Sequence, residues 1–351
     1  RVWDLTDMNN VTSRVLRGHT RSVSSVVKLN ETTIVSGSYD RTLRVWDLTD
    51  MDNVTSRALN GHNENVHSVI KLNETTIVSG SYDDTLRVWD LTDMNNVTSR
   101  VLNGHTGSVM SLMKLNETTI VSGSYDNTLR VWDLSDMDNV TSRALRGHTS
   151  YVYSVTKLND TTIVSGSYDR TLRVWDLTDM NNVTSRALRG HTGYVFSVMK
   201  LNETTIVSGS RDETLRVWDL TDMNNVTSRA LRGHTRSVIS VIRLNETTIV
   251  SGSADNTLRV WDLSDMDNVT SRALEGHTDR VISVMRLNET TIVSGSLDRT
   301  LWVWDLTDMN NVTSRVLRGH IDSVYSVMKL NDTTIVSGSG DHTVRVWYGV
   351  H

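Results

Sequence analysis

The chain has 351 residues and a formal net charge of −5, with acidic and basic residues interleaved along its length. This charge gives no basic field for nucleic acid, the absence of cysteine excludes disulfides and thiolate metal sites, and no apolar run approaches the roughly 18 residues that span a bilayer. We therefore expect no nucleic acid, membrane, metal ion or cofactor as a partner, and the cysteine usage fits a reducing, cytoplasmic compartment.

One 43-residue unit, repeated eight times, accounts for almost the whole chain. A Trp-Asp pair recurs with this step from Trp3 to Trp304, and a further Trp stands at Trp347. Because repeated units pack mainly on their neighbours, an array can reach this length without dividing, and we expect residues 1–351 to form a single domain. Each repeat starts with a Gly-His pair, at Gly18, Gly61, Gly104, Gly147, Gly190, Gly233, Gly276 and Gly319.

Four short strands are predicted in the first complete repeat, and we call them a, b, c and d in chain order. They cover residues 23–29, 33–38, 42–48 and 54–59 and are rich in β-branched residues, whereas Asn, Asp and Glu between them supply turns. The strands do not alternate cleanly between apolar and polar residues, which indicates that both faces of each sheet are buried. Helical periodicity is absent.

The repeat length, the Gly-His start and the Trp-Asp end resemble the WD40 repeat, the unit of a family of β-propellers. The resemblance implies an all-β fold, a closed ring of eight four-stranded antiparallel blades. One blade must combine strand d at 11–16 with the C-terminal strands, and this closure removes exposed sheet edges. Strand c of that blade is present twice, as 1–5 and as 343–347. We favour the second copy, because its hairpin with 334–339 is local.

In this family the His of Gly-His, a strand-b Ser, an Asp of the b–c turn and the strand-c Trp form a hydrogen-bonded chain. The position of the turn places Trp46 opposite about Ser36, and the Ser is expected to donate to the Asp. A Ser, His and Asp set also suggests a hydrolase triad, but a catalytic set occurs once and not eight times, so we expect no enzyme. The matching residues in the first and fourth repeats are His19, Ser36, Asp40, Trp46, His148, Ser165, Asp169 and Trp175.

Variation between the repeats is confined to a few positions, which in the first repeat are Arg21, Ser22, Ser24, Tyr39 and Arg41. They lie in the d–a loop, the b–c turn and the start of strand a, which share one face of a propeller, here called the top face. The a–b and c–d loops of the opposite face barely change. Copying that made the repeats uniform would act on both faces alike, so we interpret the variable face as a contact surface.

Large aromatic residues are concentrated at the variable positions, which hold eight of the nine tyrosines and the only Phe. Six of these aromatic residues come from blades three to five, with two arginines at their border, and such residues anchor interfaces. We predict a non-catalytic, monomeric scaffold that binds a protein or peptide on its top face. The predicted binding residues are Tyr125, Tyr151, Tyr153, Tyr168, Arg170, Tyr194, Phe196 and Arg211.

Other interpretations stay open. A lectin would use the tyrosines of four successive b–c turns as sugar platforms, although the adjacent residues differ where a lectin needs repeated polar partners. The amino-acid sequence of strands b and c also resembles that of the F-box substrate receptors among WD-repeat proteins. Those receptors bind phosphopeptides through Arg at the positions of Ser24 and Tyr39. Only Arg211 matches that pattern, so the phosphopeptide pocket does not carry over. The four tyrosines that a lectin would use as sugar platforms are Tyr39, Tyr82, Tyr125 and Tyr168.

Near-identical repeats with a diversified face also resemble the sensor ends of nucleotide-binding immune-type receptors in fungi and bacteria. The chain begins in mid-repeat at Arg1, so we expect a segment upstream of it. Sixteen Asn-x-Thr sequons, such as Asn30-Glu31-Thr32, would carry glycans in a secreted eukaryotic protein. Their Asn and Thr also serve a turn and a strand in every repeat, and we interpret the sequons as a by-product of repetition.

Overall fold

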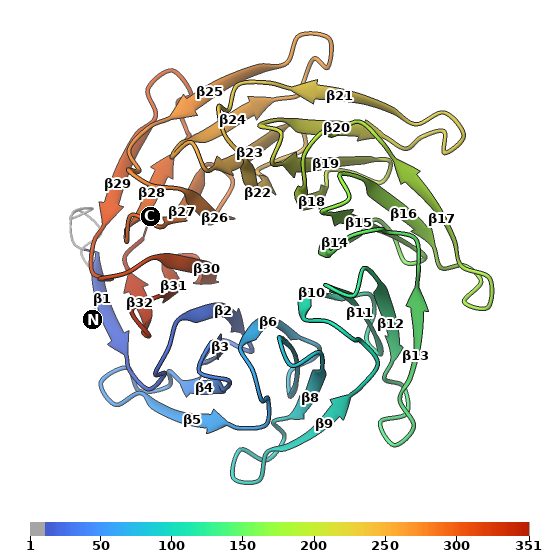
Figure 1. Ribbon diagram of the computed structural model, residues 1–351. Coiled ribbons are helices and arrows are strands. Elements are labelled where there is room, and N and C mark those ends of the chain that lie inside the picture. The colour runs from blue at the N-terminus through green and yellow to red at the C-terminus, as the bar shows by residue number, and fades with distance from the viewer. Residues whose placement is uncertain (1–10, 351) are drawn as a thin grey trace.

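The computed structural model describes residues 11–350, which form a ring of eight blades (Figure 1). Each blade is a four-stranded antiparallel sheet with strand a nearest the ring centre and strand d on the outside. The expected all-β, eight-bladed propeller is therefore confirmed. Among the described residues, no helix is long and apolar enough to cross a membrane.

The strands recur with almost the same bounds in every repeat. The a strands are β2 Val23–Lys28, β6 Val66–Lys71, β10 Val109–Lys114, β14 Val152–Lys157, β18 Val195–Lys200, β22 Val238–Arg243, β26 Val281–Arg286 and β30 Val324–Asn331. The b strands are β3 Thr33–Ser38, β7 Thr76–Ser81, β11 Thr119–Ser124, β15 Thr162–Ser167, β19 Thr205–Ser210, β23 Thr248–Ser253, β27 Thr291–Ser296 and β31 Thr334–Ser339. The c strands are β4 Leu43–Asp47, β8 Leu86–Asp90, β12 Leu129–Asp133, β16 Leu172–Asp176, β20 Leu215–Asp219, β24 Leu258–Asp262, β28 Leu301–Asp305 and β32 Val344–Tyr348. The d strands are β5 Thr55–Leu59, β9 Thr98–Leu102, β13 Thr141–Leu145, β17 Thr184–Leu188, β21 Thr227–Leu231, β25 Thr270–Leu274, β29 Thr313–Leu317 and β1 Thr12–Leu16.

The ring closes in blade 8, which joins both ends of the chain. Blade 1 contains β2 to β5 in order, and blade 8 contains β30, β31 and β32 with β1 as its outer strand. The register of β1 on β32 runs from Thr12 opposite Tyr348 to Leu16 opposite Val344. The C-terminal copy of strand c therefore completes the blade, as predicted. The alternative copy at residues 1–5 lies outside the described residues.

The core is divided into eight apolar clusters, one between each pair of adjacent blades. Between blades 1 and 2, for example, Leu43 and Val45 pack with Val66, Ile77 and Trp89. A cluster of the same kind lies between blades 8 and 1 and completes the circle. Because each blade is covered on both sides, its middle strand is buried along most of its length, which explains why the strands lack apolar and polar alternation.

Two features of strand register differ from a plain ladder. Trp46 lies opposite Ile34 and not Ser36, so the predicted pairing is wrong by two residues, because Ser36 faces Arg44 across the hairpin. Strand a also contains a bulge: in β2, the register against β3 shifts between Val23 and Ser25. The bulge leaves the residue at position 24 unpaired, and such a residue is re-aimed out of the ladder.

Hydrogen bonds between loops define the two faces of the ring. The amide of Tyr39 donates to the carbonyl of Ser22 at 2.9 Å and joins the b–c turn to the d–a loop. On the other face, the amide of Leu48 donates to the carbonyl of Thr32 at 2.7 Å and joins the c–d loop to the a–b loop. The variable positions of the sequence therefore share the top face, and the invariant loops share the lower face.

Candidate functional site

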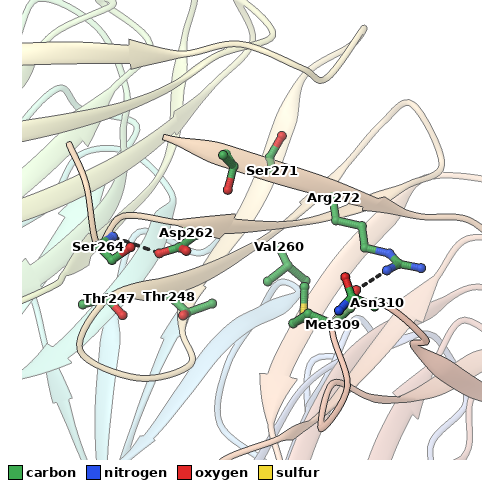
Figure 2. A pocket seen from close by; sticks show the side chains of 10 residues that line it. Thr247, Thr248, Val260, Asp262, Ser264, Ser271, Arg272, Met309 and Asn310 are labelled. Atoms are coloured by element: carbon green, nitrogen blue, oxygen red, sulfur yellow. Dashed lines mark hydrogen bonds between the residues drawn. The ribbon is translucent and has the colours of Figure 1, made fainter. Parts of the chain in front are cut away.

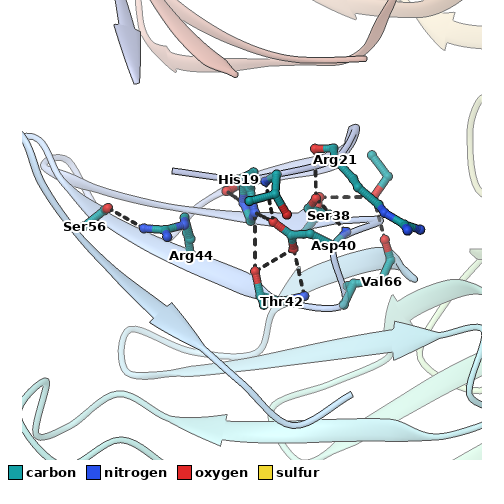
Figure 3. A network of polar contacts seen from close by, with 12 residues as sticks. His19, Arg21, Ser38, Asp40, Thr42, Arg44, Ser56 and Val66 are labelled. Carbon is teal, nitrogen blue, oxygen red and sulfur yellow. Dashed lines mark hydrogen bonds and ion pairs between the residues drawn. The ribbon is translucent and has the colours of Figure 1, made fainter. Parts of the chain in front are cut away.

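A buried polar network stands beneath the top face of every blade, and Figure 3 shows the part of it around His19 and Asp40 in blade 1. In blade 1, His19 Nδ1 lies 2.8 Å from Asp40 Oδ2, and His19 Nε2 lies 2.8 Å from Ser36 Oγ. The indole Nε1 of Trp46 donates to the same Ser36 oxygen at 2.8 Å. These contacts link all four positions that the sequence suggested.

The order of bonds within this network differs from the expected one. The Ser36 hydroxyl lies between the imidazole and the indole, and Asp40 receives its bonds from His19 and Thr42, so the expectation that the Ser donates to the Asp is wrong. A neutral imidazole with its proton on Nδ1 satisfies every member, because Nε2 then accepts from the Ser while the Ser accepts from Trp46. Burial acts to raise the pKa of Asp40, but hydrogen bonds from His19 and Thr42 outweigh it and lower this pKa well below its usual range.

The threonine after the b–c turn was missed by the sequence analysis. Thr42 Oγ1 donates to Asp40 Oδ1 at 2.6 Å, and its amide donates to the same oxygen at 3.0 Å. A Thr stands at this position in all eight repeats, and this invariance is the signal that could have found it.

The fourth blade repeats the network, with His148 Nδ1 at 2.7 Å from Asp169 and Trp175 donating to Ser165 at 2.8 Å. The side chain of His148 is 0% exposed, and Ser165 is likewise 0% exposed. A serine with no access to solvent and with both bonding neighbours inside the blade cannot attack a substrate. The arrangement instead ties the d–a loop and the b–c turn to the strands.

The aromatic residues of blades 3 to 5 make a continuous stack on the top face. We call the set Tyr125, Tyr151, Tyr153, Tyr168, Tyr194 and Phe196 the aromatic cluster. Tyr125 stacks on Tyr151 with ring centroids 4.2 Å apart, and Tyr168 stacks on Tyr194 at 4.4 Å and an interplanar angle of 7°. Tyr151 and Tyr168 join the two pairs at 5.7 Å. Each stacked pair joins the b–c turn of one blade to the d–a loop of the next, so the cluster crosses three blades.

Two members of the aromatic cluster lie deeper than the others. Tyr153 contacts Tyr168 at 5.6 Å and Phe196 at 5.7 Å, and burial raises the pKa of Tyr153 to about 12. Both Tyr153 and Phe196 occupy the bulge position of strand a and are half-buried, so they support the ring stack from the side of the ring centre. Tyr151, by contrast, is 41% exposed and presents the most open ring of the cluster.

The two arginines predicted at the border have different surroundings. The Arg211 guanidinium lies over the Tyr194 ring, 5.0 Å from its centroid, at the end of the stack. Arg170 is exposed at the b–c turn of blade 4 with a backbone φ of 71°. A non-glycine residue at positive φ is strained, and all eight repeats place a non-glycine residue at this turn position.

A smaller group of rings lies on blades 1 and 2. Tyr39 and Tyr82 are 6.1 Å apart, and His67 stacks on Tyr82 at 5.6 Å. Burial lowers the pKa of His67 to about 4. His67 is therefore a neutral ring in this group at physiological pH, and it is separate from the eight His residues of the polar networks.

The family model described as "WD domain, G-beta repeat" matches eight segments of the chain, 10–47, 53–90, 96–133, 139–176, 182–219, 225–262, 268–305 and 311–348. The chain belongs to the WD40 repeat family. WD40 propellers are typically protein-interaction scaffolds and are generally non-catalytic.

One solved structure similar to this WD40 chain is described as "Crystal structure of WD40 beta propeller domain of Doa1". The two chains share 21% sequence identity, the match covers 95% of each, and the TM-score is 0.66. At this identity the likeness concerns the fold. No curated protein matches the chain by sequence.

The lower face of the WD40 ring has shallow grooves of about 400–480 Å³ between neighbouring blades, one of which is shown in Figure 2. Across this groove Arg272 of strand d donates to the carbonyl of Met309 in the c–d loop of the next blade. Arg186 likewise donates to the carbonyls of Met223 and Asn224, the latter at 2.9 Å. This strand-d Arg is present in all eight repeats, and its contact with the next blade was not predicted from the sequence. Within residues 11–350 no group of acidic or His side chains is placed to hold a metal ion.

The loops of the lower face take part in contacts between blades. Lys71 Nζ at the end of β6 donates to the Leu29 carbonyl of blade 1 at 2.5 Å. The little-varied lower face is therefore tied to inter-blade packing, and the candidate contact surface rests on the residues of the top face.

Proposed function

We propose that this WD40 propeller is a non-enzymatic recognition module that binds a protein or peptide on its top face, with the aromatic cluster as the main contact. The observation that carries the proposal is the unbroken stack of rings across blades 3 to 5, open at Tyr151 and ended by Arg211. Rigid aromatic rings beside Arg are the usual composition of interface hot spots, because they bury much area at little entropic cost.

The stacking geometry speaks against sugar platforms. A sugar platform needs an open ring face, and Tyr82, Tyr125 and Tyr168 each already have one face stacked on another ring. The rings of Tyr168 and Tyr194 are almost parallel at 7°, so their facing surfaces cover each other while their edges and hydroxyl groups can contact a partner. Ring edges and hydroxyl groups suit a polypeptide with mixed polar and apolar contacts.

A direct test selects binding peptides from a random displayed library on the wild-type chain and then measures the affinity of the selected peptides for variants. Tyr151→Ala removes the most exposed ring of the cluster, and we expect it to weaken binding by about thirtyfold, in line with a hot-spot loss of 2 kcal/mol. Tyr325→Ala is the matched control, because Tyr325 is similarly exposed at 38% but lies on blade 8.

Melting temperature is measured on the same variants to separate binding from stability. We expect Tyr151→Ala to melt only slightly below the wild type, because the ring is 41% exposed and its stack on Tyr125 lies at the surface. If Tyr325→Ala weakens the selected peptides as much as Tyr151→Ala, the aromatic cluster is not the contact and the proposed location is wrong.

A further inference from the structure

The top face of blades 4 to 6 is the longest run of adjacent blades with an excess of arginine at its loop positions. Charged residues there stand at the variable positions and at the exposed position before each Gly-His pair. Blade 1 also has such an excess, with Arg17, Arg21 and Arg41, but it stands beside Glu64 and Asp84 of blade 2. Blades 7 and 8 are balanced at these positions, with Arg280, Arg299 and Arg318 against Glu275, Asp279 and Asp322. Blades 4 to 6 have only Glu213 against six exposed arginines, which are Arg146, Arg170, Arg189, Arg211, Arg232 and Arg236.

These six arginines have no carboxylate partner within the part of the chain that the structure describes. Some exposed arginines elsewhere do reach one, as in the pairs Arg41 with Glu64 at 3.8 Å and Arg100 with Asp138 at 3.5 Å. What distinguishes blades 4 to 6 is the number of such arginines on adjacent loops against a single Glu. Arg211 contacts only a ring, that of Tyr194, and is thereby held at the edge of the aromatic cluster. Like charges on neighbouring loops repel one another, so this surface is electrostatically unfavourable until an anion binds.

The residue types point to carboxylates. All six cations are Arg, whose planar fork matches a carboxylate with two parallel hydrogen bonds. Burial raises the pKa of Tyr168 and of Tyr125, so both phenols stay protonated and can donate hydrogen bonds to an anion. The arginines come from separate loops on three blades, one or two per loop, which fits single charges spaced along a chain better than one compact dianion.

We propose that the partner bound by the aromatic cluster is an extended peptide segment rich in Asp and Glu, whose carboxylates pair with the arginines of blades 4 to 6. This inference rests on the proposed function and adds the chemical class of the partner.

The test uses two double variants of the full chain that differ only in the blades they change. Arg170→Glu with Arg236→Glu reverses charge on blades 4 and 6. Arg299→Glu with Arg21→Glu makes the same change at the same two repeat positions on blades 7 and 1, so the change in net charge is equal. Random dodecamer peptides are selected on each protein, and the Asp and Glu content of the enriched peptides is compared with that of the starting library.

The wild type and the control are expected to enrich acidic peptides, and the blade 4 and 6 variant is expected to lose that enrichment. A peptide selected on the wild type should bind this variant at least tenfold more weakly and bind the control within about twofold of wild type, with affinity falling as NaCl rises. Peptides enriched without an acidic bias would overturn the inference while leaving the proposed function standing. No enrichment at all would count against both.

Two further arms address other anions. An enriched peptide with Glu replaced by Gln should lose affinity, and one with Glu replaced by phosphoserine should gain none over the parent. Stronger binding of the phosphoserine version, or binding of a single-stranded dT oligonucleotide in place of the peptides, would overturn the assignment to carboxylates.

Discussion

At the scale of single residues, the eight polar networks explain why so few side chains are free to vary. Each network saturates a buried His, Ser and Asp, and a buried polar group without a partner costs free energy. The residues that do vary stand on top of these networks and do not enter them.

Removal of one network histidine should destabilise the protein measurably. In the variant His148→Ala, Asp169 loses its Nδ1 donor and Ser165 loses a neighbour, and we expect the free energy of unfolding to fall by about 1–3 kcal/mol. His234→Ala removes the same contacts in blade 6 and should cost a similar amount. Thermal and urea unfolding of both variants measure the effect, and unchanged curves would show that the networks do not support the blades.

Acid should destabilise the protein through the eight network aspartates. Their pKa values are lowered in the folded state although burial opposes this, because His and Thr donate to each carboxylate. A carboxyl group with a lower pKa in the folded than in the unfolded state stabilises the fold at pH values above its unfolded pKa. This stability is lost as the pH falls through the folded pKa. We expect the free energy of unfolding to fall progressively below about pH 4.

The variant Asp169→Asn is the matched comparison for this pH dependence. It should be less stable than the wild type at neutral pH, because the charge that His148 and Thr171 stabilise is gone. It should also lose less stability than the wild type between about pH 5 and pH 3. Parallel curves for the two proteins would contradict the role of this carboxylate.

At the scale of strands and blades, contact between neighbours is close enough to specify glycine in strand b. A Cβ atom on Gly166 would lie 2.7 Å from Val195 Cγ1 and 2.9 Å from Val198 Cγ2 of the next blade. Real Cβ atoms do not approach this closely, so an added methyl group forces the blades apart.

Gly166→Ala should therefore destabilise the protein by about 1–3 kcal/mol, as other overpacked cores do. Val195→Ala makes room for the methyl group, so the double variant should lose less than the sum of the two single losses. A double-mutant cycle by chemical unfolding checks this. Additive losses would mean that the two residues do not compete for the same space.

Much of this fold could be predicted from the sequence because the same pattern of strands and turns occurs in eight repeats. The predicted c strand at 343–347 and its partner 11–16 were placed correctly, since the hairpin of 343–347 with 334–339 is local and costs little loop entropy. The residue that lies opposite Trp46 across the b–c hairpin was predicted wrongly, because the register of a hairpin depends on where its turn begins. The depth of Tyr153 and the bond from Arg186 to the next blade could not be predicted, since both depend on the distance between blades.

At the scale of the whole molecule, the ring depends on one strand supplied from the other end of the chain. β1 buries Leu16 in the cluster between blades 8 and 1, and its pairing with β32 covers the edge that β32 would otherwise expose. An unpaired, exposed strand edge is a template for association.

A chain that starts at Gly18 lacks β1 and should be less stable and prone to associate. We expect a lower melting temperature and a concentration-dependent increase in mass by light scattering. A synthetic peptide of residues 11–17 should bind to the open edge and restore both properties. A shortened chain that stays monomeric and melts like the wild type would show that closure by β1 contributes nothing.

The eight inter-blade clusters use the same residues, apart from small changes. This equivalence affects how the gene can change in evolution as well as how stable the protein is. A genetic exchange at equivalent repeat boundaries of two such genes joins halves whose apolar surfaces already fit, so the recombinant chain keeps eight blades and their packing. What such an exchange alters is the order of the variable loops on the top face. Because the blades are interchangeable, a single genetic exchange can give a new combination of variable loops on the top face. No intermediate sequence that fails to fold is needed.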